Sequence, residues 1–322
     1  MTKEEKTLVI DNKEIRPGEF KVVDIPVGNL PSGTKININV NVYRSMFKGP
    51  VVLVLAGVHG DEINGVEIVR SSIDENIYGD LIRGTVIVIP LLNVFGFINF
   101  SRDVPDGKDV NRSFPGTKSG SLASRVAYTL TKKILPYIDF GIDFHTGGGS
   151  RFNFPQVRFG STNKTARELA MAFAPPFIIE KPYIIKSLRK VAKDMKVPII
   201  VYEGGESTRL DGYSISKGLD GLKRVLKHVG MIEHAQDAES KVILLRKTSW
   251  IRAPYSGLFI WTRQSGVYVH KGEPLGLVND VAGTTSVTVL SNKDGYIIGH
   301  NNASVVSHGD ALFHVGYDFE KL

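Results

Sequence analysis

Two histidines and a glutamate in this chain have the types and the spacing of a metal-binding set. His59 and Glu62 form an H-x-x-E motif directly after the apolar run at residues 51–58, and His145 closes a later apolar run within residues 138–149. Two imidazoles and one carboxylate are a common ligand set for a catalytic zinc ion, which keeps one coordination position open for water or substrate. The set predicts a metal-dependent hydrolase.

Each of these signals is weak by itself. A short H-x-x-E motif often arises without any metal, and a lone histidine at the end of a strand is more often hydrogen-bonded than bound to metal. Their coincidence favours the metal site, because all three residues fall at or just beyond the carboxyl ends of expected strands, where open α/β sheets bind ligands. Iron or another divalent metal would accept the same set.

Two further carboxylates belong to the same expected strand ends. Asp143 lies two residues before His145 on the same face, so it could orient that imidazole; capping a neighbouring turn is its alternative role. Glu203 follows the apolar run at 197–202 and precedes two glycines, which suit a tight turn. There it could act as general base toward a metal-bound water. Glu206 is expected to be a solvated acid in the loop.

The loop at residues 101–116 supplies three side chains that could bind an anionic substrate, namely Arg102, Asn111 and Arg112. Guanidinium groups bind carboxylates in bidentate fashion and can stabilise a developing oxyanion. Asn111 can donate a hydrogen bond beside Arg112. Taken alone, this loop would be read as an ordinary surface loop with charge-paired arginines.

Strands and helices are expected to alternate from about residue 50 to residue 230. Short β-branched runs predict buried strands at 51–55, 85–90, 140–144 and 197–202. Helical periodicity predicts helices at 62–77, 121–135, 165–173 and 214–229, with Ser121 as a cap and Pro136 as a stop signal for the second. This alternation predicts an α/β domain with a mostly parallel or mixed sheet. The boundaries expected for it are residues 49–238, after a β-rich N-terminal extension at residues 1–48, in which 35–43 alternates as a half-buried strand.

Residues 239–322 lose the helical period and predict a separate all-β domain. The segment 269–278 echoes 306–315, with Val, Gly, an acid and Leu at matching places, which suggests two related halves. Turn and strand motifs here resemble the biotinyl/lipoyl-type barrel-sandwich fold. The connecting segment 279–291 holds no lysine, so we expect a structural or substrate-gating module and not a swinging-arm carrier.

The composition is that of an ordinary soluble protein, with 42% hydrophobic and 23% charged residues. No cysteine is present, so a zinc site must use His, Asp or Glu. The charged start and the lack of a long apolar segment predict a cytoplasmic protein without membrane contact. The net charge of +7 comes from scattered Lys and Arg, so no nucleic acid partner is expected, while an anionic small substrate fits.

Four motifs, in order, resemble the succinylglutamate desuccinylase/aspartoacylase family of carboxypeptidase A-like zinc hydrolases: GVHGDE (57–62), DVNRSF (109–114), DFHTGG (143–148) and YEGGE (202–206). The resemblance covers about residues 50–230 and is closest to the predicted deacylase branch, whose substrates are diverse. It implies a mixed-sheet, zinc carboxypeptidase-like catalytic domain and one zinc ion per chain. The residues it implies are His59, Glu62 and His145 as ligands, Glu203 as base, Asn111 and Arg112 on a substrate carboxylate, and Arg102 on the scissile carbonyl.

The function that we predict is removal of an N-acyl group from an amino acid or related small amine. The alternatives are a carboxypeptidase-like peptidase or an esterase on the same scaffold, and a non-catalytic metal-binding protein whose β module recruits a partner. Exposed edge strands of that module could pair between subunits, so a homo-oligomer stays open.

Overall fold

A long mixed β-sheet organises the chain in the computed structural model, which describes residue 2 and residues 7–238 and 241–322. Its middle holds the parallel strands β10 (Ile199–Glu206), β7 (Phe140–Gly147), β5 (Val51–Ala56) and β6 (Thr85–Ile89), side by side in that order. Antiparallel β4 (Lys35–Arg44) and β3 (Phe20–Asn29) extend the sheet beyond β6. Beyond β10 follow antiparallel β8 (Arg151–Phe159) and then β9 (Phe177–Glu180). A small hairpin, β1 (Leu8–Ile10) and β2 (Lys13–Ile15), precedes them.

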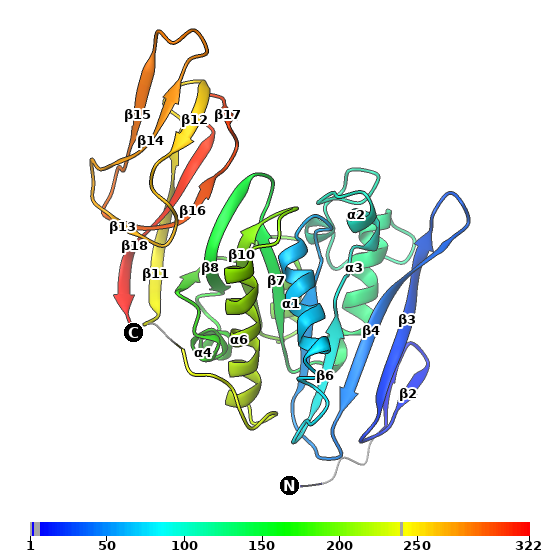
Figure 1. Cartoon of the computed structure of the whole chain (residues 1–322). Coiled ribbons are helices and arrows are strands. Elements are labelled where there is room, and N and C mark those ends of the chain that lie inside the picture. The colour runs from blue at the N-terminus through cyan, green and yellow to red at the C-terminus, as the bar shows by residue number, and fades with distance from the viewer. Residues whose placement is uncertain (1, 3–6, 239–240) are drawn as a thin grey trace.

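Helices cover both faces of this sheet (Figure 1). One face packs against α1 (Ile63–Asp74), α4 (Lys164–Phe173) and α6 (Gly212–His228), whose buried residues share one core cluster with the strands. The other face packs against α3 (Leu122–Lys133) and α5 (Leu188–Asp194), with the short helices α2 (Val94–Ile98), η1 (Val110–Arg112) and η2 (Leu135–Tyr137) nearby. Because both faces are covered, the central strands are largely apolar, and the polar residues of β7 and β10 lie toward their carboxyl ends. The mixed α/β arrangement predicted from sequence is confirmed.

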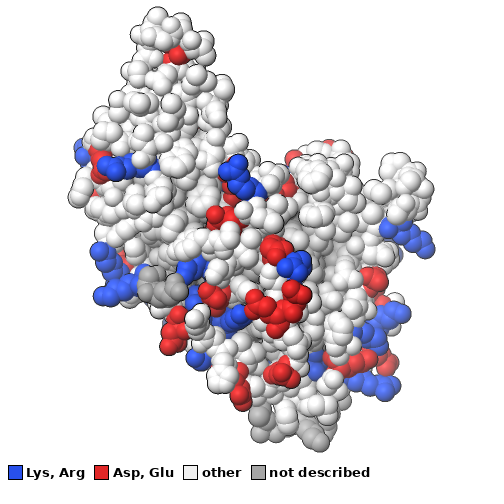
Figure 2. Space-filling model, viewed as in Figure 1, with Lys and Arg blue, Asp and Glu red and all other residues white. Residues whose placement is uncertain are grey.

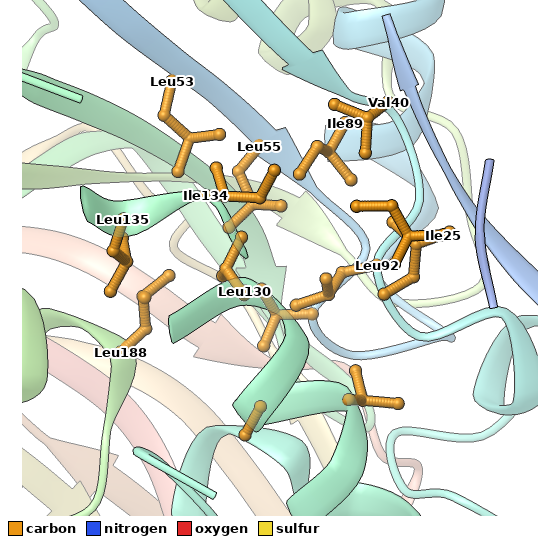
Figure 3. Packing of buried hydrophobic residues seen from close by; sticks show 14 of the residues in the cluster. Ile25, Val40, Leu53, Leu55, Ile89, Leu92, Leu130, Ile134, Leu135 and Leu188 are labelled. Carbon is orange, nitrogen blue, oxygen red and sulfur yellow. The ribbon is translucent and has the colours of Figure 1, made fainter. Parts of the chain in front are cut away.

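Aliphatic side chains from both layers interdigitate on the α3 face. Figure 3 shows Leu53 and Leu55 of β5 and Ile89 of β6 packed toward Leu130 of α3 and the adjoining Ile134. All of these side chains are at most 1% exposed. Burying a residue of this size contributes about 1.5–3 kcal/mol each. This packing makes a rigid base for the strand ends that carry the candidate site.

The predicted helices are confirmed, with boundaries shifted by a few residues. Ser121 caps α3 as expected, and its hydroxyl accepts a hydrogen bond from the Ser124 amide. Strands β7 and β10 continue three or four residues beyond the expected 140–144 and 197–202, so His145 and Glu203 lie within strands and not after them. Pairing with neighbouring strands, which no local pattern reveals, accounts for the extra length.

The C-terminal strands form a β lobe at one end of the main sheet (Figure 1). Its strands are β11 (Ile243–Arg252), β12 (Gly257–Trp261), β13 (Tyr268–Val269), β14 (Pro274–Asn279), β15 (Ser286–Leu290), β16 (Gly295–Asn301), β17 (Val305–Val306) and β18 (Ala311–Lys321). A separate four-stranded sheet has the order β15-β14-β12-β17. The other four strands continue the main sheet, because β11 pairs with β9 and β16 pairs with β8.

The internal echo in this lobe corresponds to two equivalent strand-turn-strand units. Each starts with a two-residue strand, β13 or β17, and turns through a glycine of positive φ, Gly272 (85°) or Gly309 (91°). In both turns a carboxylate accepts a backbone hydrogen bond, Glu273 from His270 and Asp310 from Ser307. The two repeated segments predicted from the sequence therefore adopt equivalent turns.

Among the residues that the structure describes, no helix has the length and apolarity required to cross a bilayer.

Candidate metal centre and active site

Three buried side chains converge at the carboxyl ends of β5 and β7. The Nδ1 atoms of His59 and His145 lie 2.8 Å and 2.7 Å from the two carboxylate oxygens of Glu62 and 3.2 Å from each other. All three side chains are at most 5% exposed, and one ligand atom from each lies within 4.8 Å of the others. Two imidazole nitrogens and a carboxylate oxygen thus lie close together, as the ligands of a bound cation must. The predicted set can therefore hold a metal ion.

Glycines allow the backbone to bring these ligands together. His59 lies in the turn after β5, and Glu62 is the residue before α1. A Cβ at Gly60 would lie 2.0 Å from the Gly96 carbonyl carbon, so the turn needs glycine there. A Cβ at Gly65 in α1 would lie 2.6 Å from the backbone oxygen of Phe144. Glycine thus lets α1 approach β7 beside His145.

Each of the two imidazoles has a carboxylate near its other ring nitrogen, Nε2. Asp143 Oδ2 lies 2.8 Å from His145 Nε2, which directs Nδ1 toward the ligand set, and the orienting contact expected for Asp143 is observed. Asp109 Oδ1 lies 3.4 Å from His59 Nε2 in the corresponding place. Such partners fix ring orientation and raise ligand basicity. Asp109 was not predicted; its membership in the DVNRSF motif was the available signal.

Charge compensation sets the protonation of these ligands. Burial raises the pKa of Glu62, but the imidazoles of His59 and His145 outweigh it, and the net pKa lies well below its usual range. Burial lowers the pKa of His145, but Asp143 and Glu62 outweigh it and raise the pKa well above its usual value. For His59, burial is likewise outweighed by Glu62 and Asp109, and the pKa is raised. The pocket favours positive charge between these carboxylates, which a divalent cation can supply in place of the protons.

Arg102 lies beside the ligand set, as predicted. Its Nη1 is 3.2 Å from Glu62 Oε1 and 3.2 Å from His59 Nδ1. Its Nη2 donates to Asp109 Oδ2 at 2.9 Å, and Nε reaches the same oxygen at 3.2 Å. Asp109 therefore holds the guanidinium while also facing His59, so one carboxylate aligns a ligand and a cation. The side chain is 36% exposed, which leaves it accessible to a substrate oxygen.

Glu203 lies on β10 directly across from His145 on β7. Its two oxygens accept hydrogen bonds from β8, Oε2 from Asn153 Nδ2 and Oε1 from Arg158 Nη1, both at 2.7 Å. The side chain is 12% exposed and faces the same pocket as the ligand set. A carboxylate oxygen has two acceptor sites, so each can still accept a proton. Sequence reasoning missed Asn153 and Arg158, because β8 was not predicted.

Asn111 and Arg112 lie on η1 at the rim of this pocket. Asn111 Oδ1 accepts from the Leu188 amide at 2.9 Å, which ties the loop to the start of α5 and leaves the Nδ2 donor for another partner. Arg112 Nη1 donates to the Asn111 carbonyl at 2.8 Å. Both side chains line the pocket. The structure thus brings all the predicted site residues into one cavity.

The cavity has a volume of about 720 Å³ and reaches from the ligand set to the C-terminal lobe. Its far wall includes Arg158, Arg189 and Trp250, none of which the sequence singled out. Trp250 belongs to β11 and stacks on His314 with a centroid distance of 4.4 Å. Glu206 is also placed differently from expectation: it ends β10 and accepts a hydrogen bond from Asn302 of the C-terminal lobe. It is therefore not a solvated loop acid.

Comparison with known proteins identifies the family. A family model described as the succinylglutamate desuccinylase/aspartoacylase catalytic domain matches residues 48–229, more than half of the chain. The chain belongs to the succinylglutamate desuccinylase/aspartoacylase family. The matched range contains every candidate ligand and catalytic residue described above.

Three known proteins are similar to most of the chain. N-alpha-acetyl-L-2,4-diaminobutyric acid deacetylase from Halomonas elongata is 26% identical over 292 residues, covering 85% of this chain and 84% of that protein. A succinylglutamate desuccinylase/aspartoacylase structure from Rhodobacter sphaeroides superposes with a TM-score of 0.84 at 27% identity, covering 95% of this chain and 97% of the other. The product-bound ectoine utilization protein EutE (DoeB) from Ruegeria pomeroyi has the same fold, with a TM-score of 0.83 at 23% identity over 97% and 98% of the two chains.

Proposed function

We propose that this protein is a zinc-dependent amidohydrolase that removes an N-acyl group from an amino acid or a related small amine. The observation that carries the proposal is the convergence of His59, Glu62 and His145 in one cavity with Glu203 on the adjacent strand. A ligand set alone would suit a metal-binding protein without activity. A carboxylate facing the same cavity supplies the acid/base group that hydrolysis requires.

One zinc ion per chain would be held by His59, Glu62 and His145. Two imidazole nitrogens and a carboxylate oxygen with convergent geometry fit zinc, and Asp143 and Asp109 align the rings. When bound there, zinc supplies Lewis-acid polarisation of a carbonyl and lowers the pKa of a water molecule.

The chain's own residues divide the remaining tasks. Glu203 would take a proton from the attacking water and return it to the leaving nitrogen. Arg102, held by Asp109, would donate to the carbonyl oxygen and to the oxyanion that develops from it. Asn111 and Arg112 would bind a substrate carboxylate at the rim of the cavity.

The named relatives support a small acylated substrate. The Halomonas elongata protein is a deacetylase of an N-acetylated diamino acid, and the cavity of about 720 Å³ suits a small molecule. We propose a carboxylate-bearing N-acyl compound as the substrate. We also propose a carboxypeptidase-like catalytic domain at 49–238, an extension at 1–48 and a barrel-sandwich domain at 239–322; residues 1, 3–6 and 239–240 lie outside the described residues. A cytoplasmic location is proposed on the sequence alone.

A substrate panel tests the proposal. N-acetyl, N-succinyl and other N-acyl amino acids, short peptides and acyl esters are incubated with zinc-loaded protein, chelated protein and Glu203→Gln. We expect release of free amino acid that requires metal, and a kcat about 10²–10⁴-fold lower in Glu203→Gln, because a positioned general base contributes about that much. Peptide cleavage alone would indicate the carboxypeptidase instead. Undiminished turnover in Glu203→Gln would refute the role of that residue.

A further inference from the structure

One neighbouring strand donates a hydrogen bond to each carboxylate oxygen of the candidate base. Asn153 and Arg158, both on β8, donate to the two oxygens of Glu203 at 2.7 Å each. Asn153 is 6% exposed, and its backbone pairs with Gly205 of β10, two residues beyond Glu203. The position of Glu203 therefore depends on how firmly β8 is placed.

The C-terminal lobe fixes β8 at this very residue. Strand β16 pairs antiparallel with β8, and Gly299 lies opposite Asn153 in the register. The approach is close: a Cβ at Gly299 would lie 2.8 Å from the Phe152 oxygen and 3.0 Å from Asn153 Oδ1. A larger residue would push the two strands apart and displace the Asn153 amide.

Hydrogen bonds of Asn302, the Asn302 latch, form a second connection between the C-terminal lobe and the strand that carries Glu203. Asn302, which follows β16, donates from Nδ2 to Glu206 Oε2 at 2.5 Å, and its backbone amide donates to the Ser150 oxygen at 2.7 Å. Its Oδ1 accepts from Trp261 Nε1 at 2.9 Å. Glu206 ends the strand that carries Glu203. Asn302 thus links the lobe to the end of β10 and to Ser150, the residue that precedes β8.

We infer that the C-terminal β lobe positions the catalytic carboxylate: β16 braces β8, whose Asn153 and Arg158 hold Glu203, and the Asn302 latch fixes the end of β10. This inference rests on the proposed role of Glu203 as base. Asn153, Gly299 and Asn302 are positioning residues, since they act through Glu203 and not on the substrate. A displacement of about 1 Å at a reacting group can cost about 100-fold in rate, so small shifts of β8 matter.

Three variants test the inference. Asn153→Asp keeps the shape of the side chain but replaces the amide donor with an oxygen that repels Glu203. Gly299→Ala separates β16 from β8, and Asn302→Ala removes the latch. Asn292→Ala, an exposed position in the same lobe, is the matched control. The kcat and KM of each variant are measured with the substrate found in the panel, and its zinc content is determined. Glu203→Gln is measured alongside them.

We expect Asn153→Asp to lower kcat at least about 10-fold and Asn302→Ala about 3- to 10-fold, with KM within about 2-fold and a full complement of zinc. A structural role of Asn153 would be preserved by the isosteric aspartate, so its kcat would then stay at the wild-type value. Hydrogen exchange supplies a readout without turnover: Asn302→Ala should accelerate exchange in residues 151–159 and 199–206, and Asn292→Ala should not.

The outcomes distinguish the role of Glu203 as base from the role of the C-terminal lobe in positioning it. Wild-type turnover in Glu203→Gln would remove the base assignment and the inference with it. If Glu203→Gln is inactive while Asn153→Asp and Asn302→Ala keep the wild-type kcat, the inference is overturned and the base assignment stands. Unchanged exchange in 151–159 and 199–206 of Asn302→Ala would also overturn it. Because Gly299→Ala adds a backbone clash, the asparagine variants decide the question if that protein does not fold.

Discussion

At the scale of single residues, metal affinity of the proposed site should depend on the carboxylates that contact its two histidines. Asp143 Oδ2 lies 2.8 Å from His145 Nε2, where it can orient the imidazole ring. Asp143→Asn should weaken zinc affinity about 10- to 100-fold, because an amide orients the ring less strongly and lowers its basicity. Competition against a chromophoric chelator measures this affinity. Asp106→Asn, an exposed loop carboxylate, is the control, and equal affinities for the two variants would contradict the assigned role.

His300 makes stability depend on pH, independently of the metal site. Burial lowers its pKa to about 4, while its side chain contacts the Ser265 hydroxyl at 2.7 Å. The unfolded chain binds the proton more readily, so stability is present above about pH 6.5 and declines as the pH falls toward 4. Between about pH 7.5 and 5 this one group should remove about 2 kcal/mol from the free energy of unfolding.

The variant His300→Gln carries no titrating group and should therefore flatten that part of the curve. Urea unfolding at a series of pH values measures the slope for both proteins. At high pH the variant should have a lower free energy of unfolding than the wild-type protein, because it loses a buried contact. On acidification its free energy of unfolding should fall less than that of the wild-type protein. Parallel curves for the two proteins would show that His300 does not titrate as described.

At the scale of elements, close approach of α1 to β7 joins the two halves of the ligand set. Alanine at position 65 should favour an isolated helix by up to about 1 kcal/mol, but here its Cβ would meet the Phe144 oxygen at 2.6 Å. The clash should dominate and destabilise the fold by about 1–3 kcal/mol. It should also weaken zinc binding, because Glu62 directly precedes α1 and β7 carries His145.

Chemical unfolding and zinc titration of Gly65→Ala measure both effects. Gly212→Ala at the start of α6 is a matched control, since a Cβ there meets nothing within 4 Å. The control should unfold at or slightly above the wild-type midpoint. A Gly65→Ala protein with wild-type stability and zinc affinity would show that α1 can shift without moving Glu62.

At the scale of the whole molecule, metal and fold should be linked. A cation that binds the folded chain alone stabilises it, by about 2.7 kcal/mol when its free concentration is 100 times the dissociation constant. Chelation should therefore lower the thermal midpoint by several degrees, and zinc should restore it. The triple variant His59→Ala, Glu62→Ala, His145→Ala should show no such shift. If neither chelator nor zinc changes the thermal midpoint of the wild-type protein, the result would argue against the metal centre.

The charge on one face of the molecule is mixed in sign. Figure 2 shows Lys and Arg interspersed with Asp and Glu over the face in view, without a continuous basic stripe.

Local patterns predicted the central parallel strands and four of the helices, the repeat in the C-terminal lobe and the candidate ligand set, but not β8. These features depend on residues within one segment: periodic burial defines a strand or a helix, and the turn after β5 already brings His59 near Glu62. The order of the four motifs extended this to a family, which the match over residues 48–229 confirms.

The partners of these residues became visible only in the folded chain. Asn153 lies 50 positions from Glu203, and Asn302 lies 96 positions from Glu206. No local period encodes such contacts, because they form when β8, β10 and β16 pair side by side and bring distant backbone together. The exposure of Trp250 to the cavity has the same origin. Residue types and spacing determined which chemistry is available, whereas strand pairing across the sheet decided which groups hold it in place.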